Sequence, residues 1–140
     1  MKAKVLDRPI LFYDDLCKYC RHQAALVRAG DVKEKLSILG FSDPLFRALL
    51  ADMPEEERLA SMHVVDTRGR VHSAGAAVVV LLALNPRTRW QAWLARLVPS
   101  VRRKIDREYR KLADRRSELS AKVDDAEPTT VRPRWTKLDL

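Results

Sequence analysis

The sequence predicts an α/β fold, in which strands and helices follow the order β-α-β-α-β-β-α and basic helices are added at the C-terminal end. Short apolar runs of strand length alternate with longer segments of helical periodicity, which is typical of βαβ units. The chain of 140 residues fits one domain, and no internal repeat is present. A domain of roughly this length buries about 68–70% of its unfolded surface, so it needs no disulfide to hold its core.

The first predicted unit is a strand, a helix and a second strand. Residues 9–13 (PILFY) are an apolar run that starts at a proline and ends before two aspartates, which is typical of a buried strand. Residues 17–29 repeat apolar side chains at helical spacing, and Gly30 is expected to be the C-cap of that helix. Residues 36–41 (LSILGF) predict the second buried strand.

A short helix and a hairpin are predicted next. Pro44 takes the first position of a helix over residues 45–52, directly after a Ser-Asp start signal. The acidic turn at residues 54–57 would open another short helix. Residues 62–66 (MHVVD) and 71–72 flank a Thr-Arg-Gly-Arg turn, so they predict the two strands of a hairpin.

The rest of the domain predicts helices. Residues 73–84 are nearly all apolar, so this helix should be buried. Residues 88–98 and 101–119 both have helical periodicity, and a proline interrupts the chain between them. In the second of these segments the charged side chains surround a narrow apolar face, which is typical of a helix with a large solvated surface.

The chain is expected to form a single domain over residues 1–120, which includes the C-terminal helices at 87–119, and to end in a flexible tail at 121–140. The N-terminal residues do not resemble a signal peptide, because their apolar stretch is short and acids follow it. The apolar run at residues 74–84 is too short to span a bilayer. We therefore expect a cytoplasmic protein, in a reducing setting where structural disulfides are rare.

Positive charge is concentrated near the C-terminal end. Residues 87–118 hold eleven Lys/Arg and four Asp/Glu, a net charge of +7 out of +8 for the chain. Trp90, Trp93, Leu94 and Leu97 recur on one helix face. We favour the interpretation that this stripe packs on the sheet and that the arginines form its solvated face. The alternative is an amphipathic, cationic surface for nucleic acid, an anionic membrane or an acidic partner, and no nucleic-acid motif accompanies it.

The two cysteines of the chain, Cys17 and Cys20, form one C-x-x-C pair at the predicted strand-to-helix turn. Cys17 should lie where unpaired N–H groups and the helix dipole favour a thiolate. Lys18 and Arg21 add positive charge, whereas the two aspartates before Cys17 act in the opposite direction. Cys20 follows one turn later, close enough for a disulfide. This placement predicts exchange in which Cys17 attacks a disulfide and Cys20 resolves the intermediate.

Other uses of the pair are weaker. A c-type haem requires a histidine directly after the second cysteine, and Arg21 occupies that position. A structural zinc site requires four ligands, of which the pair supplies two, and His22 would point away from them. A further alternative is two unrelated cysteines, with Cys20 in the core. His63 within a predicted strand and His72 beside the hairpin turn are assigned no role, and neither a cofactor nor a metal is assigned.

The stretch Tyr13-Asp14-Asp15-Leu16-Cys17-Lys18-Tyr19-Cys20 resembles the D-x-x-C-x-x-C signature of the DCC family of predicted thiol–disulfide oxidoreductases. The resemblance continues at residues 64–71, in a hydrophobic-Asp-x-x-Gly-x-Val hairpin, and at Gly75-Ala76-Ala77, where the covering helix begins. It ends in a C-terminal segment that contains Val101-Arg102-Arg103, Tyr109 and Arg115-Arg116. The resemblance covers residues 8–116.

The resemblance implies a thioredoxin-like fold and a thiol–disulfide oxidoreductase in which Asp14, Cys17 and Cys20 are the defining residues. Asp14 would either accept backbone N–H bonds at the helix start or take and return the proton of the resolving thiol. The family often has glycine where Asp15 stands. Ser61 stands where thioredoxin itself has a cis-proline that lines the substrate groove, so binding of an extended peptide in that manner is not expected.

The sequence supports two functions of different classes. The first is a thiol–disulfide oxidoreductase that acts on a protein or small-molecule disulfide and receives electrons from another thiol system. The second is a non-catalytic thioredoxin-like binding module that docks on an anionic partner through its basic C-terminal helices. Binding that falls steeply with salt and ignores both cysteines would favour the second.

Overall fold

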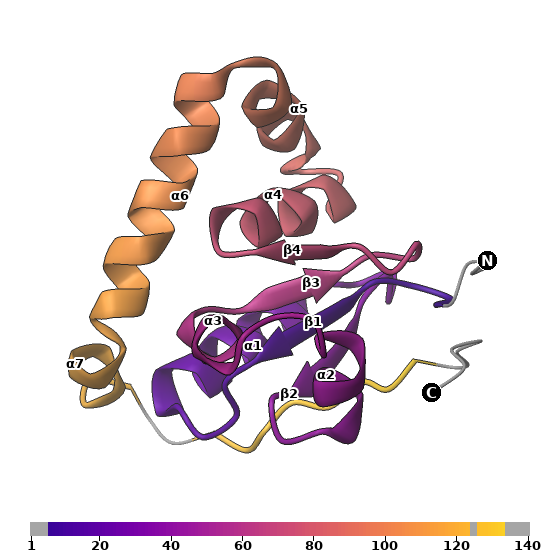
Figure 1. Ribbon diagram of the computed structural model, residues 1–140. Helices are drawn as coiled ribbons and strands as arrows, with labels where there is room; N and C mark the ends of the chain where they lie inside the picture. The colour runs from indigo at the N-terminus through magenta and orange to yellow at the C-terminus, as the bar shows by residue number, and fades with distance from the viewer. Residues whose placement is uncertain (1–5, 124–125, 134–140) are drawn as a thin grey trace.

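The computed structural model describes residues 6–123 and 126–133, and within them four strands form one mixed sheet (Figure 1). β1 pairs parallel to β2 and antiparallel to β3, and β3 pairs antiparallel to β4. The predicted α/β class and the predicted order of elements along the chain are confirmed. The strands, in the spatial order β2-β1-β3-β4, are β2 (Ser37–Gly40), β1 (Ile10–Tyr13), β3 (His63–Val65) and β4 (Val71–Ser73).

Seven helices accompany the sheet in the described part of the chain. The segment predicted as one helix over residues 101–119 is divided, because the backbone at Arg115 (φ −102°, ψ 15°) leaves the helical region. The short last helix then turns back toward the start of the first. The helices are α1 (Lys18–Gly30), α2 (Pro44–Leu49), α3 (Glu55–Ala60), α4 (Gly75–Leu84), α5 (Arg89–Leu97), α6 (Pro99–Asp114) and α7 (Arg116–Ser120).

Several predicted helix boundaries are wrong, among them the end of α2, which lies at Leu49 and not at residue 52. Gly30 is the last residue of α1, and Asp31 is the C-cap. The carboxylate of Asp31 accepts two backbone N–H bonds from the loop before β2, so the helix ends where this side chain ties the loop down. Ser73 belongs to β4 and pairs with β3, so α4 begins only at Gly75.

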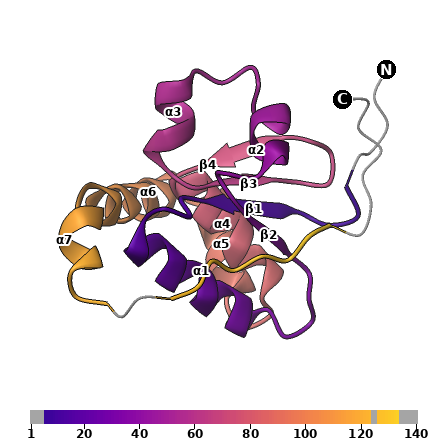
Figure 2. The same ribbon diagram turned by 90° about the horizontal axis from the view of Figure 1, so that it is seen from below.

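The helices lie on both faces of the sheet (Figure 2). Side chains alternate between the two faces of a strand, so neighbouring residues of β1 join different cores. Ile10 and Phe12 pack with Phe46 of α2 on one face. Leu11 and Tyr13 pack with α1 and α4 on the other. The C-terminal end of β1 is thereby held rigidly on both sides, and the chain passes from it directly into the cysteine pair.

Contacts with α4 and with the residue before β3 fix the position of α6. The carboxylate of Asp106 accepts the Gly75 N–H at 3.0 Å, which caps the start of α4. A Cβ atom on Gly75 would lie 2.4 Å from the Cα of Asp106, so only glycine allows the two helices to approach this closely. Further along α6, the Tyr109 hydroxyl accepts the Met62 N–H at 2.9 Å. These contacts set the direction in which α6 crosses the molecule, and at its C-terminal end α7 lies beside α1 (Figure 1).

The favoured interpretation that the tryptophan stripe packs on the sheet is wrong. Ala92 and Ala95 are the fully buried residues of α5, in a cluster shared with α4 and α6. These small side chains let α5 pack closely, and the stripe lies on the opposite side of the helix, where Trp90, Trp93 and Leu97 are exposed. The spacing therefore predicted an apolar face correctly. The face that packs against the protein, however, is the one that contains Ala92 and Ala95.

The described part of the predicted tail makes specific contacts. Ile38 of β2 and Val131 exchange backbone hydrogen bonds of 2.8 and 2.7 Å in an antiparallel bridge. The Tyr13 hydroxyl donates to the Thr129 carbonyl at 3.0 Å and accepts its N–H at 2.8 Å. Residues 126–133 thus run along β2. Residues 124–125 and 134–140, which also belong to the predicted tail, lie outside the described part of the chain. Every described helix falls short of the length and apolarity that crossing a bilayer requires.

Candidate active site

Cys17 forms the N-cap of α1 at the end of the turn that follows β1. Its backbone is extended (φ −94°, ψ 119°), and its Sγ accepts the Cys20 N–H at 3.2 Å. The sulfur thus satisfies one of the N–H groups that a helix start leaves unpaired, a place that Ser, Thr or Asp usually takes. The Cys17 N–H in turn donates to the Asp14 carbonyl at 3.2 Å, which closes the turn. Both cysteines are free thiols.

Cys20 lies one turn further into α1. Burial, together with the neighbouring Cys17 sulfur, raises the pKa of its thiol to about 12, although Arg116 acts in the opposite direction. The Cys20 thiol is therefore protonated at neutral pH. Both residues are half-buried, but the two sulfurs have different surroundings, because the first caps the helix and the second lines an apolar cavity.

Side chains of α7 and the end of α6 close over the pair. The Ser120 hydroxyl accepts the Tyr19 N–H at 3.1 Å and lies 3.8 Å from the Cys17 Sγ. Accepting from Tyr19 leaves the Ser120 hydroxyl its proton, which it can donate to the Cys17 sulfur. Arg116 donates from Nη1 to the Cys20 Sγ at 3.9 Å. Each sulfur thus has one polar partner from the C-terminal part of the chain.

Asp14 connects the turn with Arg116. One carboxylate oxygen accepts the Leu16 N–H at 3.1 Å, and the other lies 3.6 Å from Arg116 Nη1. The carboxylate therefore holds the turn one residue before the helix cap and also faces the guanidinium that contacts Cys20. The predicted site residues Asp14, Cys17 and Cys20 lie together: hydrogen bonds from backbone N–H groups join Cys17 to each of the other two, and Arg116 contacts Asp14 and Cys20.

Asp15 is held by the segment that follows β2. The Ser42 hydroxyl donates to its carboxylate. A Cβ atom on Gly40 would overlap the Asp15 side chain, so the glycine at the end of β2 makes room for it. The Asp15 carbonyl accepts from Arg21, which also donates to the Ala126 carbonyl at 2.8 Å. The charges of Asp15 and Arg21, which the sequence placed near the cysteines, are thus engaged by other parts of the fold.

An apolar cavity of about 240 Å³ lies against Cys20, between α1, the sheet and the last turns of α6. Asp14 and Arg116 are at its polar edge. Such apolar surroundings disfavour a charge on the resolving sulfur, which agrees with the raised pKa of Cys20. Its apolar lining consists of Leu11, Ala24, Val27, Met62, Val78, Leu81, Leu112 and Ala113.

The histidines lie away from the pair. His63 is buried, with Nδ1 2.7 Å from the Ser73 hydroxyl and Nε2 2.9 Å from the Arg58 carbonyl. His72 pairs with Asp66 at 3.0 Å in the hairpin. Within residues 6–123 and 126–133, no three His, Cys, Asp or Glu side chains are grouped to hold a metal ion.

Ser61 stands at the end of α3, directly before the residue that enters the cavity wall. Its backbone is extended (φ −156°, ψ 171°), and no peptide bond in the described part of the chain is cis. Its hydroxyl donates to the Met62 carbonyl at 3.2 Å. A thioredoxin-like groove shaped by a cis-proline is accordingly not formed at this position.

Two residues of the site carried no assigned role in the sequence. Arg116 appeared only within the C-terminal part of the family resemblance, and Ser120 carried no signal. They lie 96 and 103 residues from the cysteines that they contact. A polar residue in a basic helix is ordinary by itself, so only the path of α6 reveals the two contacts.

A comparison with family models matches residues 11–122 to the family described as DCC1-like thiol-disulfide oxidoreductase. The match includes the cysteine pair, the sheet and the helices through α7. Neither the curated proteins nor the solved structures contain a match. The mixed sheet with helices on both faces is consistent with a thioredoxin-like α/β fold.

Proposed function

The chain belongs to the DCC1-like thiol-disulfide oxidoreductase family, and we propose that it reduces or forms disulfides by exchange at Cys17 and Cys20. The observation that carries this proposal is the asymmetry of the two sulfurs. Cys17 caps the helix and receives the Cys20 N–H, whereas Cys20 faces an apolar cavity that keeps it protonated. An attacking sulfur and a resolving sulfur need these two environments.

In the reducing direction, the Cys17 thiolate attacks one sulfur of a substrate disulfide. A bond forms between Cys17 and that sulfur, the substrate S–S bond breaks, and one substrate thiolate leaves. Cys20 then loses its proton and attacks the Cys17 sulfur, which releases the second substrate thiolate. Two electrons pass to the substrate, and the protein is left with a Cys17–Cys20 disulfide. The oxidising direction is the same sequence in reverse.

The second step requires a proton acceptor, because the Cys20 thiol is protonated at neutral pH. Asp14 is our candidate for this acceptor. Its carboxylate lies 3.6 Å from the Arg116 nitrogen that contacts the Cys20 sulfur, so base, guanidinium and thiol form one cluster. Arg116 would stabilise the Cys20 thiolate while it exists, since an adjacent cation favours the charged form.

We further propose that electrons come from another thiol system and that no bound cofactor takes part, because a dithiol alone can carry the two electrons. A cytoplasmic location is part of the proposal, since disulfide exchange through two free thiols suits a reducing compartment. The substrate is a protein or small-molecule disulfide.

The test is a redox titration of the wild type. The protein is equilibrated in glutathione buffers of graded potential, its thiols are trapped by alkylation, and they are counted by mass spectrometry. We expect one reversible two-electron transition that links Cys17 and Cys20, at a potential between about −270 and −120 mV. Two thiols that never pair at any potential would refute the proposal.

Two serine variants assign the roles within the pair. Cys17→Ser should abolish exchange with a model disulfide and leave the fold intact. Cys20→Ser should still attack but should accumulate a mixed disulfide at Cys17, which mass spectrometry detects. If Cys17→Ser retained full dithiol activity, the assignment of the nucleophile would be wrong.

A further inference from the structure

We propose that α5 binds the surface of an anionic lipid bilayer through its outer face, formed by Trp90, Trp93 and Leu97. These side chains are 61%, 63% and 59% exposed. They lie on the side of α5 opposite Ala92 and Ala95, which are buried against α4 and α6. This binding is separate from the thiol chemistry and does not depend on it.

The outer face of α5 has the composition of an interfacial helix. Tryptophan combines a large apolar ring with a polar N–H, so it prefers the boundary between headgroups and acyl chains. The three residues follow the spacing i, i+3, i+7, which aligns them in one stripe along the helix. Exposing such a stripe to water is unfavourable. A bilayer surface buries its rings without requiring the helix to cross the membrane.

Positive charge accompanies the outer face of α5 along the sequence. Residues 86–105 hold six basic residues and no acidic residue. Arg89 and Arg96 are exposed on α5 itself. An apolar stripe flanked by cations is complementary to a surface that offers acyl chains behind negative headgroups. The remaining basic residues of this stretch, all exposed, are Arg87, Arg102, Arg103 and Lys104.

This charge favours a bilayer over two other possible binding partners of the α5 face, a second copy of the chain and a nucleic acid. In a symmetric dimer through α5, the same patch meets itself, so Arg89 and Arg96 would approach their own copies without acidic partners. A nucleic-acid duplex would satisfy the cations, but its grooves and phosphates give the contiguous Trp–Trp–Leu stripe little apolar surface to contact, and stacked bases of a single strand would leave Leu97 without an apolar partner. An anionic bilayer satisfies both parts of the patch.

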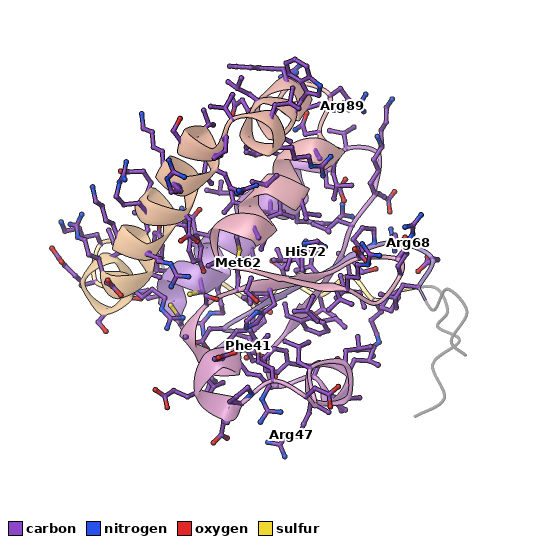
Figure 3. The ribbon with its side chains drawn as sticks, turned by 45° about the horizontal axis from the view of Figure 1, so that its top comes forward. Phe41, Arg47, Met62, Arg68, His72 and Arg89 are labelled. Carbon is purple, nitrogen blue, oxygen red and sulfur yellow. The ribbon has the colours of Figure 1, made fainter. Side chains whose placement is uncertain are left out.

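The location of α5 is compatible with simultaneous redox activity. α5 joins the N-terminal end of α6, and the cysteine pair lies at the other end, beside α7 (Figure 1). A helix of 16 residues, the length of α6, spans about 24 Å. Figure 3 shows Arg89 of α5 and Arg47 of α2 at opposite ends of the molecule. A bilayer seated on α5 would therefore leave the thiols in water.

Vesicle binding tests the proposal, with tryptophan fluorescence and co-sedimentation as readouts. Trp135 is replaced by Phe in every form, so that the emission comes from Trp90 and Trp93 alone. Vesicles are made of phosphatidylcholine, with or without phosphatidylserine. We expect a blue shift of emission and co-sedimentation with the anionic vesicles, and binding weaker by roughly tenfold or more on phosphatidylcholine alone. Added salt should weaken binding to the anionic vesicles.

Matched variants distinguish binding through the outer face of α5 from nonspecific binding to vesicles. The double variant Trp90→Ser/Trp93→Ser should lose co-sedimentation, whereas Val32→Ser, which removes an apolar side chain 84% exposed elsewhere, should retain it. The double variant Arg89→Gln/Arg96→Gln should weaken binding by roughly tenfold, and Arg47→Gln should have little effect. Far-ultraviolet circular dichroism confirms that each variant is folded.

Three results would overturn the proposal. The first is a wild type that does not bind anionic vesicles. The second is equal loss in the α5 variants and in their controls. The third is a concentration-dependent dimer that Trp90→Ser/Trp93→Ser disrupts, because the stripe would then be an interface between copies.

Discussion

The Nη1 atom of Arg116 lies 3.9 Å from the Sγ of Cys20, although 96 residues separate them in the chain. Within the part of the chain that the structure describes, this guanidinium is the charged group that donates a hydrogen bond to the resolving sulfur. We therefore expect Arg116→Gln to slow the resolving step by roughly tenfold, the effect of about one pKa unit. A model disulfide that releases a coloured thiol reports both steps, since the first equivalent follows attack by Cys17 and the second follows resolution.

Arg116→Lys is the matched control for this prediction, because it keeps the positive charge and should retain most of the second-phase rate. The first phase should change less than the second in both variants. Equal slowing of both phases by Arg116→Gln would show that the residue only holds the fold. An unchanged second phase would show that it does not act on Cys20.

Asp14→Asn separates the two roles of Asp14. Asparagine keeps an oxygen that can accept the Leu16 N–H, so the turn should survive, but it cannot take a proton. Without this base, the resolving rate should follow the thiolate fraction of Cys20. Because the pKa of Cys20 is about 12, that fraction should rise about tenfold per pH unit between roughly pH 7 and 10. The wild-type rate should be higher at neutral pH and less steep. Identical pH profiles in the wild type and in Asp14→Asn would show that Asp14 holds the turn and does not act as a base.

Ser120→Ala should slow alkylation of Cys17 by iodoacetamide at neutral pH by a factor of roughly 2 to 10. The Ser120 hydroxyl lies 3.8 Å from the Cys17 sulfur with its proton available, so its removal takes one donor from the thiolate. Ser117→Ala removes a hydroxyl from the exposed side of the same helix and should leave the rate unchanged. Equal rates in all three proteins would contradict the contact.

Local sequence signals predicted the order of the elements and the pair Cys17/Cys20, because apolar runs, turn residues and C-x-x-C spacing act over a few residues. They did not predict which side of α5 is buried, since Ala92 and Ala95 carry little apolar area yet decide how closely helices pack. They did not assign Ser120 a contact with Cys17, because that contact depends on the long path of α6.

Gly75→Ala should destabilise the protein by about 1–3 kcal/mol, the usual range for overpacking. The added methyl would lie 2.4 Å from the Cα of Asp106, so α6 must move and α7 with it. Gly30→Ala is the matched control, because nothing lies within 4 Å of its Cβ position and it ends a helix. It should be neutral or stabilising by up to about 1 kcal/mol. Urea unfolding measures both, and equal effects would refute the close approach.

His63 should make folding stability depend on pH. The Arg58 carbonyl can only accept, so His63 donates from Nε2 and receives the Ser73 hydroxyl at Nδ1, which is the neutral form. Burial lowers the pKa of His63 below its ordinary value. The unfolded chain therefore takes up a proton first, near pH 6.5, and stability falls as the pH drops below that value. Urea unfolding between about pH 8 and 5 should show this loss, and His63→Gln should reduce it. If His63→Gln lost the same stability as the pH falls, the pH dependence would come from other titratable groups.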